Sequence, residues 1–245
     1  MRLPVGALGD RLLRLFVHQS SGARRTMRIT KHGIREIALS AVVTGGLAAL
    51  ALLFAPGAWK ALTALPLLLQ TWVVSFFRDP ARRVPGGEGL LVSPADGAIA
   101  EISEVVEETY LGCEAVKVGI FMSIFNVHVN RAPVSGRVEH IKYTRGKFLD
   151  ARDPASSTQN ENNVVGVKMN ARDGKVLVKQ ISGVIARRII CDCRVGETLE
   201  RGGRIGMIKF GSRVEVFVPK SMGLKILVGV GDRVKAGSSV LGEFP

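Results

Sequence analysis

Two long uncharged stretches near the start of the chain constrain its architecture more than any other feature. The first covers residues 37–59, and after Lys60 the second covers residues 61–77. Each is about long enough to cross or deeply enter the hydrocarbon core of a bilayer. The Phe-Ala-Pro-Gly string at residues 54–57 is typical of a turn between two helices. We therefore expect a hydrophobic, membrane-associating helical hairpin over residues 36–78, with a buried hairpin of a soluble protein as the alternative.

The charge distribution predicts where this hairpin is placed. Basic residues flank it on both sides, which predicts that both of its ends lie in the cytoplasm. The formal net charge of +13 favours an anionic partner, either nucleic acid or acidic phospholipid. Aromatic residues make up only 6% of the chain, and no nucleic-acid-binding motif is present in the sequence. We expect no nucleic acid partner, an anionic membrane surface, and a location at the cytoplasmic face of the cell membrane.

Residues 1–35 form a separate basic N-terminal segment in this interpretation. Leucines, Phe16 and Val17 alternate there with Arg11 and Arg14, so the stretch can lie on an anionic leaflet as an amphipathic helix. A solvated, frayed terminus is the equal alternative.

Beyond residue 79 the composition changes to short β-branched runs separated by glycine, which predicts a β-rich domain over residues 79–245. A weak internal repeat aligns residues 195–202 (VGETLERG) with residues 230–237 (VGDRVKAG). The glycines of each copy supply turn geometry between strands. The repeat resembles the half-motifs of biotinyl and lipoyl domains, so the expected fold is mainly β (α+β), like a barrel-sandwich hybrid.

The three cysteines do not suggest a disulfide framework or a metal site. Cys113 stands alone, and Cys191 and Cys193 are spaced too tightly for either role. We expect a reducing compartment and no metal.

A Gly-Ser step, Gly211-Ser212, joins two apolar runs within residues 208–219. Most such steps are simple turns. A serine hydroxyl held against the preceding carbonyl can, however, attack it and convert the amide to an ester, and the glycine leaves that carbonyl unobstructed. β-Elimination then breaks the chain, and hydrolysis of the resulting dehydroalanine leaves a pyruvoyl group at position 212. Ser212 could thus supply a covalent cofactor.

Two further strings offer acid–base groups. Asp96 lies in Ser-Pro-Ala-Asp-Gly-Ala-Ile, where Asp-Gly alone is a good turn, and His128 lies in Phe-Asn-Val-His-Val-Asn-Arg-Ala-Pro, where a lone histidine is usually structural. Taken in order, Pro-Ala-Asp-Gly, Asn-Val-His-Val-Asn-Arg-x-Pro and Phe-Gly-Ser-Arg resemble the short proenzyme form of phosphatidylserine decarboxylase, from about Phe76 to the C-terminus.

This resemblance implies cleavage between Gly211 and Ser212 into a β chain (1–211) and an α chain (212–245) that stay associated. The pyruvoyl group would form a Schiff base with the amine of phosphatidylserine, lose CO₂ and yield phosphatidylethanolamine. His128 would be the base or proton shuttle, with Asp96 orienting it.

The chain departs from longer members of the family at two of these strings. Phe-Gly-Ser-Arg stands where many of them have Leu-Gly-Ser-Thr. Their two histidines in His-x-x-His-x-Pro correspond here to His128 and Arg131, so the step that His128 serves is open. Arg131 can bind the substrate carboxylate or phosphate through its planar fork, or form an ordinary salt bridge. Asn126 is a further candidate for substrate binding.

Two other functions compete with this one. A soluble pyruvoyl amino-acid decarboxylase would use the same Ser212 chemistry, but the paired apolar stretches argue against it. A membrane-anchored biotinyl-like or lipoyl-like adaptor or carrier would keep its chain intact. The long heptad-rich hairpin typical of such adaptors is absent between Arg201 and Val230 of the sequence.

Overall fold

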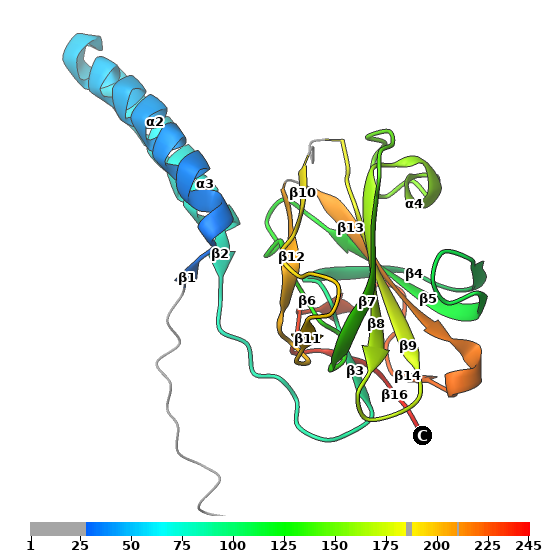
Figure 1. Ribbon diagram of the computed structural model, residues 1–245. Coiled ribbons are helices and arrows are strands. Elements are labelled where there is room, and N and C mark those ends of the chain that lie inside the picture. Colours follow the sequence, from blue (N-terminus) through cyan, green and yellow to red (C-terminus); the bar gives the residue numbers. More distant parts are fainter. Residues whose placement is uncertain (1–27, 185–187, 210) are drawn as a thin grey trace, which may run out of the picture.

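The structure is a computed structural model, and it describes residues 28–184, 188–209 and 211–245. A helical hairpin projects from a β domain, and residues 80–89 link the two (Figure 1). The amphipathic stretch expected within residues 1–35 falls almost entirely outside the described residues. The mainly β fold with an N-terminal hydrophobic hairpin is confirmed.

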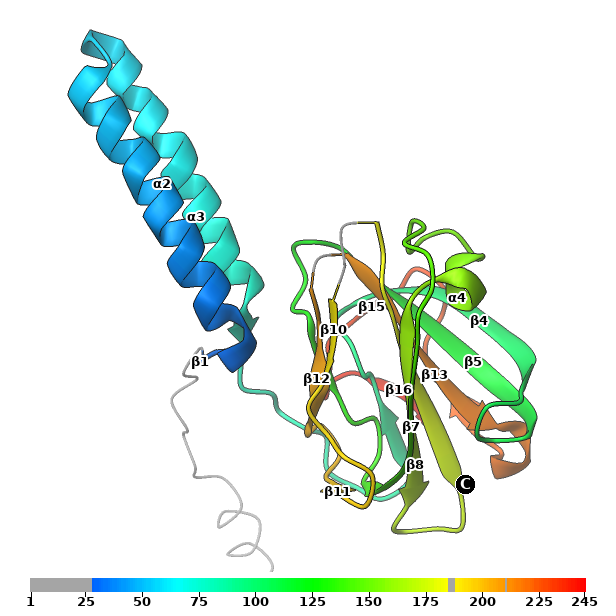
Figure 2. The same cartoon turned by 45° about the horizontal axis from the view of Figure 1, so that its top comes forward.

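The hairpin consists of α2 (Ile34–Phe54) and α3 (Ala64–Phe76), joined through the 3₁₀ helix η2 (Gly57–Thr63). The two helices run side by side in both views (Figures 1 and 2). At 1.5 Å per residue, the 21 residues of α2 span about 31 Å, close to the thickness of a bilayer core. The stretch Lys31–Phe54 is the one helical segment of the described chain that is long and apolar enough to cross a membrane.

The foot of the hairpin is packed against the β domain. Strand β1 (Arg28–Ile29) pairs with β2 (Arg78–Asp79), and the 3₁₀ helix η1 (Lys31–Gly33) leads into α2. Gly33 lies against the ring of Phe77, where an added Cβ would come within 2.3 Å of Cγ. Phe76 and Phe77 form a buried cluster with Met207 of the β domain. The hairpin is therefore held to the domain by side-chain packing as well as by the chain.

Ion pairs reinforce this junction. Glu36 of α2 pairs with Lys209 of the β domain, and Lys31 lies 3.1 Å from a carboxylate oxygen of Asp192. Each pair joins residues far apart in the sequence, so the orientation of the hairpin depends on tertiary contacts.

Over its described residues, the β domain contains three antiparallel sheets. The largest has eight strands in the order β11-β7-β8-β9-β13-β5-β4-β15, and it is flanked by the smaller sheets β10-β12-β6 and β14-β16-β3. The strands are β3 (Leu90–Val92), β4 (Gly97–Glu107), β5 (Cys113–Met122), β6 (Val129–Arg131), β7 (Gly136–Thr144), β8 (Asn162–Met169), β9 (Lys175–Ile181), β10 (Arg188–Cys191), β11 (Thr198–Leu199), β12 (Arg204–Lys209), β13 (Ser212–Pro219), β14 (Lys225–Ile226), β15 (Arg233–Val234) and β16 (Val240–Glu243). Two short helices complete the domain, α4 (Ser156–Gln159) and η3 (Lys220–Met222).

The internal repeat corresponds to two equivalent structural units. Gly196 and Gly231 have φ of 90° and 97°, in the left-handed region that favours glycine. The short strand of each copy, β11 or β15, forms one of the two edges of the eight-stranded sheet. At the end of each copy, an added Cβ on Gly237 would lie 3.2 Å from the Cα of Gly202. The two units therefore meet at their closing glycines, as expected for paired half-motifs.

Candidate active site

The Gly211-Ser212 step lies at the start of β13, shortly after β12 ends at Lys209. Gly211 has φ of 61°, a conformation that strains residues carrying a Cβ. Ser212 is fully buried and is paired with Met122 across β5, and its hydroxyl lies 3.4 Å from the sulfur of Met122. A thioether is a weak acceptor, so no strong hydrogen bond from the described residues holds the Ser212 oxygen in this position.

His128, directly before β6, contacts the same step. The backbone N–H of Gly211 donates to Nε2 of His128 at 3.2 Å, and Nδ1 lies 3.0 Å from the carbonyl oxygen of Asn126. These partners assign the proton to Nδ1 and leave a lone pair on Nε2. The ring of Phe76, at the end of α3, lies 4.3 Å from the imidazole between centroids. The histidine is therefore held in one tautomer, with its basic nitrogen directed at residue 211.

The environment keeps this imidazole neutral. Burial is the main reason that the pKa of His128 is lowered from its usual 6.5 to about 4. The hydrogen bond to the Asn126 carbonyl opposes this shift, and the nearby Arg78 guanidinium adds to it. Arg78 is held there by hydrogen bonds from Nη2 to the carbonyl of Phe125 at 2.7 Å and from Nη1 to the carbonyl of Ser75 at 2.6 Å. At neutral pH, His128 is an unprotonated base.

Asn126 supports His128 through the backbone. Its side-chain oxygen accepts hydrogen bonds from the backbone N–H and the hydroxyl of Ser123, both at 2.8 Å, which closes the turn between β5 and β6. The carbonyl of Asn126 in this turn is the acceptor for Nδ1 of His128. Asn126 therefore fixes the position of the imidazole, a role that the sequence alone did not indicate.

Asp96 does not contact His128. Its carboxylate binds Arg82 Nη2 at 2.7 and 2.8 Å and accepts from the backbone N–H of Ala236 at 2.8 Å. The linker after the hairpin brings Arg82 to the buried carboxylate, and the resulting ion pair uses both carboxylate oxygens. The orientation of His128 by Asp96 stays a prediction, and no hydrogen bond between the two side chains is present among the described residues.

Arg131 is also occupied elsewhere. Its guanidinium bonds to Asp79 Oδ1 at 2.5 Å and to the carbonyl of Gly202 at 2.9 Å, and Arg204 pairs with the second oxygen of Asp79. Arg131 was expected either to bind the substrate or to form a salt bridge, and the structure shows the salt bridge. Arg131 ties the foot of the hairpin to the closing turn of the first half-motif.

A cavity of about 470 Å³ lies beside Gly211. Its wall combines apolar and charged side chains, so the cavity can take a small ligand with a polar group. It is lined by Phe121, Met122, Ser123, Ile124, Asp150, Ala151, Arg152, Gly183, Val184 and Gly211.

Gly183, another residue of the cavity lining, packs against the carbonyl of Gly211. A Cβ added to Gly183 would lie 2.5 Å from the carbonyl oxygen of Gly211, so only glycine fits without moving that carbonyl. Asn160, which ends α4, holds the neighbouring loop, because its side chain donates to the carbonyl of Leu149 and to that of Ser182, both at 2.9 Å. The sequence did not single out Gly183 as a site residue. The one local signal for it is the Ser-Gly pair at residues 182–183, which follows a largely apolar run.

Comparisons with known proteins show the family to which this chain belongs. Residues 69–242 match the family model described as phosphatidylserine decarboxylase. The chain belongs to the phosphatidylserine decarboxylase family. The match starts within α3 and covers the β domain almost to its end, so all the site residues described above fall inside it.

Relatives of similar length support the assignment. The phosphatidylserine decarboxylase proenzyme of Geotalea uraniireducens is 44% identical over 217 residues, which cover 89% of this chain and 97% of the relative. The proenzyme of Syntrophus aciditrophicus is 49% identical over 196 residues, covering 80% of this chain and 89% of the relative. That of Geobacter sulfurreducens is 44% identical over 217 residues, with 89% and 97% covered. The resemblance identified in the three strings is confirmed, and the adaptor and the soluble amino-acid decarboxylase are not favoured.

Proposed function

We propose that this protein is the precursor of a phosphatidylserine decarboxylase that cleaves itself between Gly211 and Ser212 and uses the resulting pyruvoyl group as its cofactor. The hydrogen bond from Gly211 N–H to the neutral His128, beside the buried hydroxyl of Ser212, is the observation that carries the proposal. Membership in the family supports the decarboxylase activity.

The cleavage follows from the groups at the step. The Ser212 oxygen attacks the carbonyl carbon of Gly211, the peptide C–N bond breaks, and an ester replaces the amide. His128 accepts the hydroxyl proton and returns it to the departing nitrogen. Removal of the Ser212 α-proton then expels the carboxylate of Gly211 and leaves dehydroalanine. Water converts that group to pyruvoyl and releases ammonia, so the reaction needs no external oxidant.

The residues present fit a pyruvoyl group at position 212. The position is enclosed, lies one residue from the 470 Å³ cavity at Gly211, and has a neutral base next to it. The pyruvoyl carbonyl would supply the electrophile that takes the substrate amine as a Schiff base and the electron sink for loss of CO₂. Arg152, in the cavity wall, offers a cation to the phosphate or carboxylate of the head group.

The other predicted residues act as supports in this proposal. Asn126 orients His128, and Asp96 holds the linker through Arg82. Arg131 fixes the hairpin foot rather than the substrate.

The division of the chain follows from the same proposal. The hairpin at residues 36–78, together with the basic segment 1–35, attaches the enzyme to an anionic bilayer surface at the cytoplasmic face of the cell membrane. The hairpin extends toward the side of the domain on which β10 and β13 begin (Figures 1 and 2). In this proposal the cavity beside Gly211 faces the bilayer, where the head group of the lipid is presented.

Association of the two fragments after cleavage follows from the sheet order. Strand β13, the first element of the α chain 212–245, lies between β9 and β5 of the β chain 1–211. Eight consecutive residues of β13 pair with β5, so the new chain remains an interior strand of the domain.

Release of CO₂ from phosphatidylserine in mixed micelles, compared with release from free serine, tests the proposed substrate. We expect turnover of the lipid and little of the free amino acid, because the hairpin and the basic surface favour the lipid phase. Equal turnover of both would contradict a lipid substrate and favour a soluble amino-acid decarboxylase.

A further inference from the structure

Two buried charges directly follow the cleavage site in β13. Side chains alternate across the sheet, so Ser212 faces the main core with Val214, whereas Arg213 and Glu215 face the opposite side. Arg213 is 2% exposed and Glu215 is not exposed at all. Because an unpaired buried charge is strongly destabilising, side chains of this kind are kept only with close partners.

Arg213 and Glu215 form a network with residues of other strands. Nε of Arg213 donates to a Glu215 oxygen at 2.7 Å, and Nη2 of Arg213 bonds to the carboxylate of Glu101 on β4. The second Glu215 oxygen accepts from the hydroxyl of Ser157 at 2.8 Å. Gly119 leaves room for the guanidinium, because an added Cβ there would lie 2.5 Å from Nη2.

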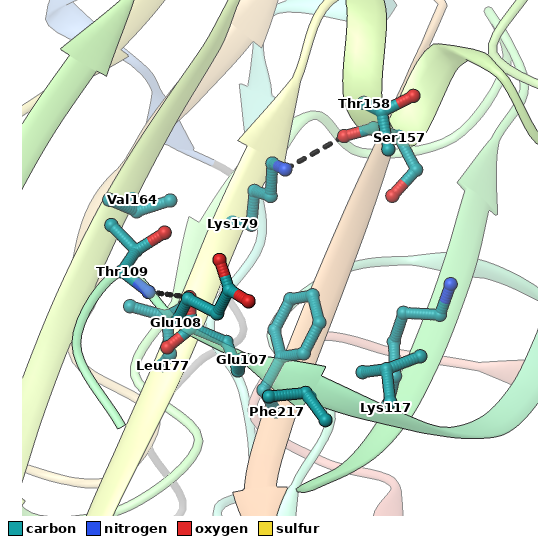
Figure 3. Close-up of a pocket in the computed structure, with 12 residues that line it drawn as sticks. Glu107, Glu108, Thr109, Lys117, Ser157, Thr158, Val164, Leu177, Lys179 and Phe217 are labelled. Atoms are coloured by element: carbon teal, nitrogen blue, oxygen red, sulfur yellow. Dashed lines mark hydrogen bonds between the residues drawn. The ribbon is translucent and has the colours of Figure 1, made fainter. Parts of the chain in front are cut away.

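Two lysines on the same face extend the network. Lys117 lies 2.6 Å from Glu101, and Lys179 donates to the carbonyl of Ser157 at 2.7 Å, which fixes the serine that binds Glu215 (Figure 3). Burial would raise the pKa of Glu101, but hydrogen bonds from Lys117 and Ser103 and the charge of Arg213 keep the pKa of this carboxyl below its usual value. Glu101 is therefore ionised at neutral pH and forms ion pairs with Lys117 and with Arg213.

The network crosses the cleavage site. Arg213 and Glu215 belong to the segment after the cleaved bond, whereas Glu101, Ser157 and the two lysines precede it. Before cleavage, the peptide bond to Gly211 also restrains position 212. After cleavage, residue 212 is a chain terminus at the end of a strand, and such ends ordinarily fray. Pairing with β9 begins at Arg213, so Ser212 itself is paired with β5 alone among the described strands.

We propose that the Arg213–Glu215 network is a clamp that holds the new terminus at position 212 in place once the chain has been cut. The clamp rests on the proposed self-cleavage. It positions the reactive group without touching substrate, because Arg213 and Glu215 lie on the opposite face of the sheet from Ser212. The prediction is that the network matters much more in the cleaved protein than in the precursor.

Hydrogen exchange compared between the two forms tests the clamp. We would introduce Glu215→Gln into the wild-type chain and into the uncleaved Ser212→Ala precursor, and follow the amides of residues 213–216. In the cleaved protein, we expect exchange to rise about tenfold and kcat to fall about tenfold with little change in KM. In the precursor, we expect exchange to change less than about twofold. Glu101→Gln, at a partly exposed partner, gives the same comparison if Glu215→Gln does not fold.

The exposed pair between Lys220 and Glu104, at 2.6 Å, provides a matched control because it also joins the two fragments. Lys220→Met should change neither exchange nor kcat. Equal increases in the cleaved protein and the precursor, or no increase in the cleaved protein, would overturn the clamp. A wild-type chain that remains a single fragment by mass would overturn the clamp together with the self-cleavage, so the two failures are distinguishable.

Discussion

The ring of Phe76 lies 4.3 Å from the imidazole of His128, at an interplanar angle of 34°. Phe76 is the last residue of α3, and His128 accepts the N–H of Gly211. The helical hairpin therefore ends on the histidine that contacts the Gly211-Ser212 step. This contact helps to bury the imidazole and joins the position of the hairpin to the geometry of the site.

Replacement of Phe76 by alanine should expose His128 to water and raise its pKa toward 6.5. The large buried ring leaves a cavity when it is truncated, so water gains access to the imidazole. We expect slower self-cleavage and a pH dependence displaced to higher pH, measured from the rate of fragment appearance between pH 4 and 8. Phe125→Ala, at a ring that is 68% exposed, is the control and should leave both unchanged. An unaltered pH profile in Phe76→Ala would contradict the proposed shielding.

The low pKa of His128 predicts the pH dependence of self-cleavage. Since the imidazole is neutral above about pH 4, the rate should be nearly constant from pH 8 to pH 5. As the pH falls below about 4, the proton on Nε2 removes the base, and the rate should fall about tenfold per pH unit. His128→Gln should cleave at least about a hundredfold more slowly at every pH. A rate that already falls between pH 7 and 6 would contradict the assignment.

The same shift predicts that stability depends on pH. Between pH 6.5 and about 4, the unfolded chain binds a proton at His128 that the folded chain does not, so stability falls as the pH decreases through this window. The whole effect amounts to about 3 kcal/mol and is complete below pH 4. Urea unfolding of the Ser212→Ala precursor measures it. His128→Gln should lack this slope, and a slope that is identical in both proteins would refute the prediction.

Gly183→Ala should block or greatly slow self-cleavage. The added methyl group would lie 2.5 Å from the carbonyl oxygen of Gly211, so the carbonyl must move away from the attacking hydroxyl. A displacement of this kind costs about a hundredfold in rate. Gly86→Ala is the matched control, because an added Cβ there meets no atom within 4 Å. Normal cleavage in Gly183→Ala would mean that the Gly211 carbonyl reacts from another position.

Asp96→Ala should destabilise the fold rather than change the chemistry. It leaves the Arg82 guanidinium, which is 9% exposed, without its carboxylate, at a cost of about 3–5 kcal/mol. Urea unfolding in the Ser212→Ala background gives this value, and the exposed Asp173→Ala should leave the free energy of unfolding nearly unchanged. Full stability together with cleavage as slow as in His128→Gln would instead show that Asp96 acts on the histidine.

Features encoded by local patterns could be predicted from the sequence. The uncharged stretches specify the hairpin, and the two glycine pairs of the repeat specify turns that require positive φ, as seen at Gly196 and Gly231. The Gly211-Ser212 step stays a prediction, which the sequence supports because the reaction needs those two residue types next to one another. In each case, the determining information lies within a few residues.

Features that depend on distant partners could not be predicted. The sequence motifs suggest that Asp96 and His128 act as an acid–base pair. In the structure, Asp96 forms an ion pair with Arg82, and the backbone carbonyl of Asn126 orients His128. Arg131 forms an ion pair with Asp79, directly after the hairpin. The proximity of Gly183 to the Gly211 carbonyl arises where the loop after β9 meets the start of β13. Such partnerships depend on how segments pack, which periodicity and composition do not encode.

The intact mass of the purified, active protein under denaturing conditions tests the central claim most directly. The account predicts two fragments, one of residues 1–211 and one of residues 212–245. The N-terminus of the second fragment is a pyruvoyl group, so this fragment resists stepwise N-terminal sequencing. The Ser212→Ala variant should give a single inactive chain. An active wild-type protein with an unbroken bond between Gly211 and Ser212 would contradict the account.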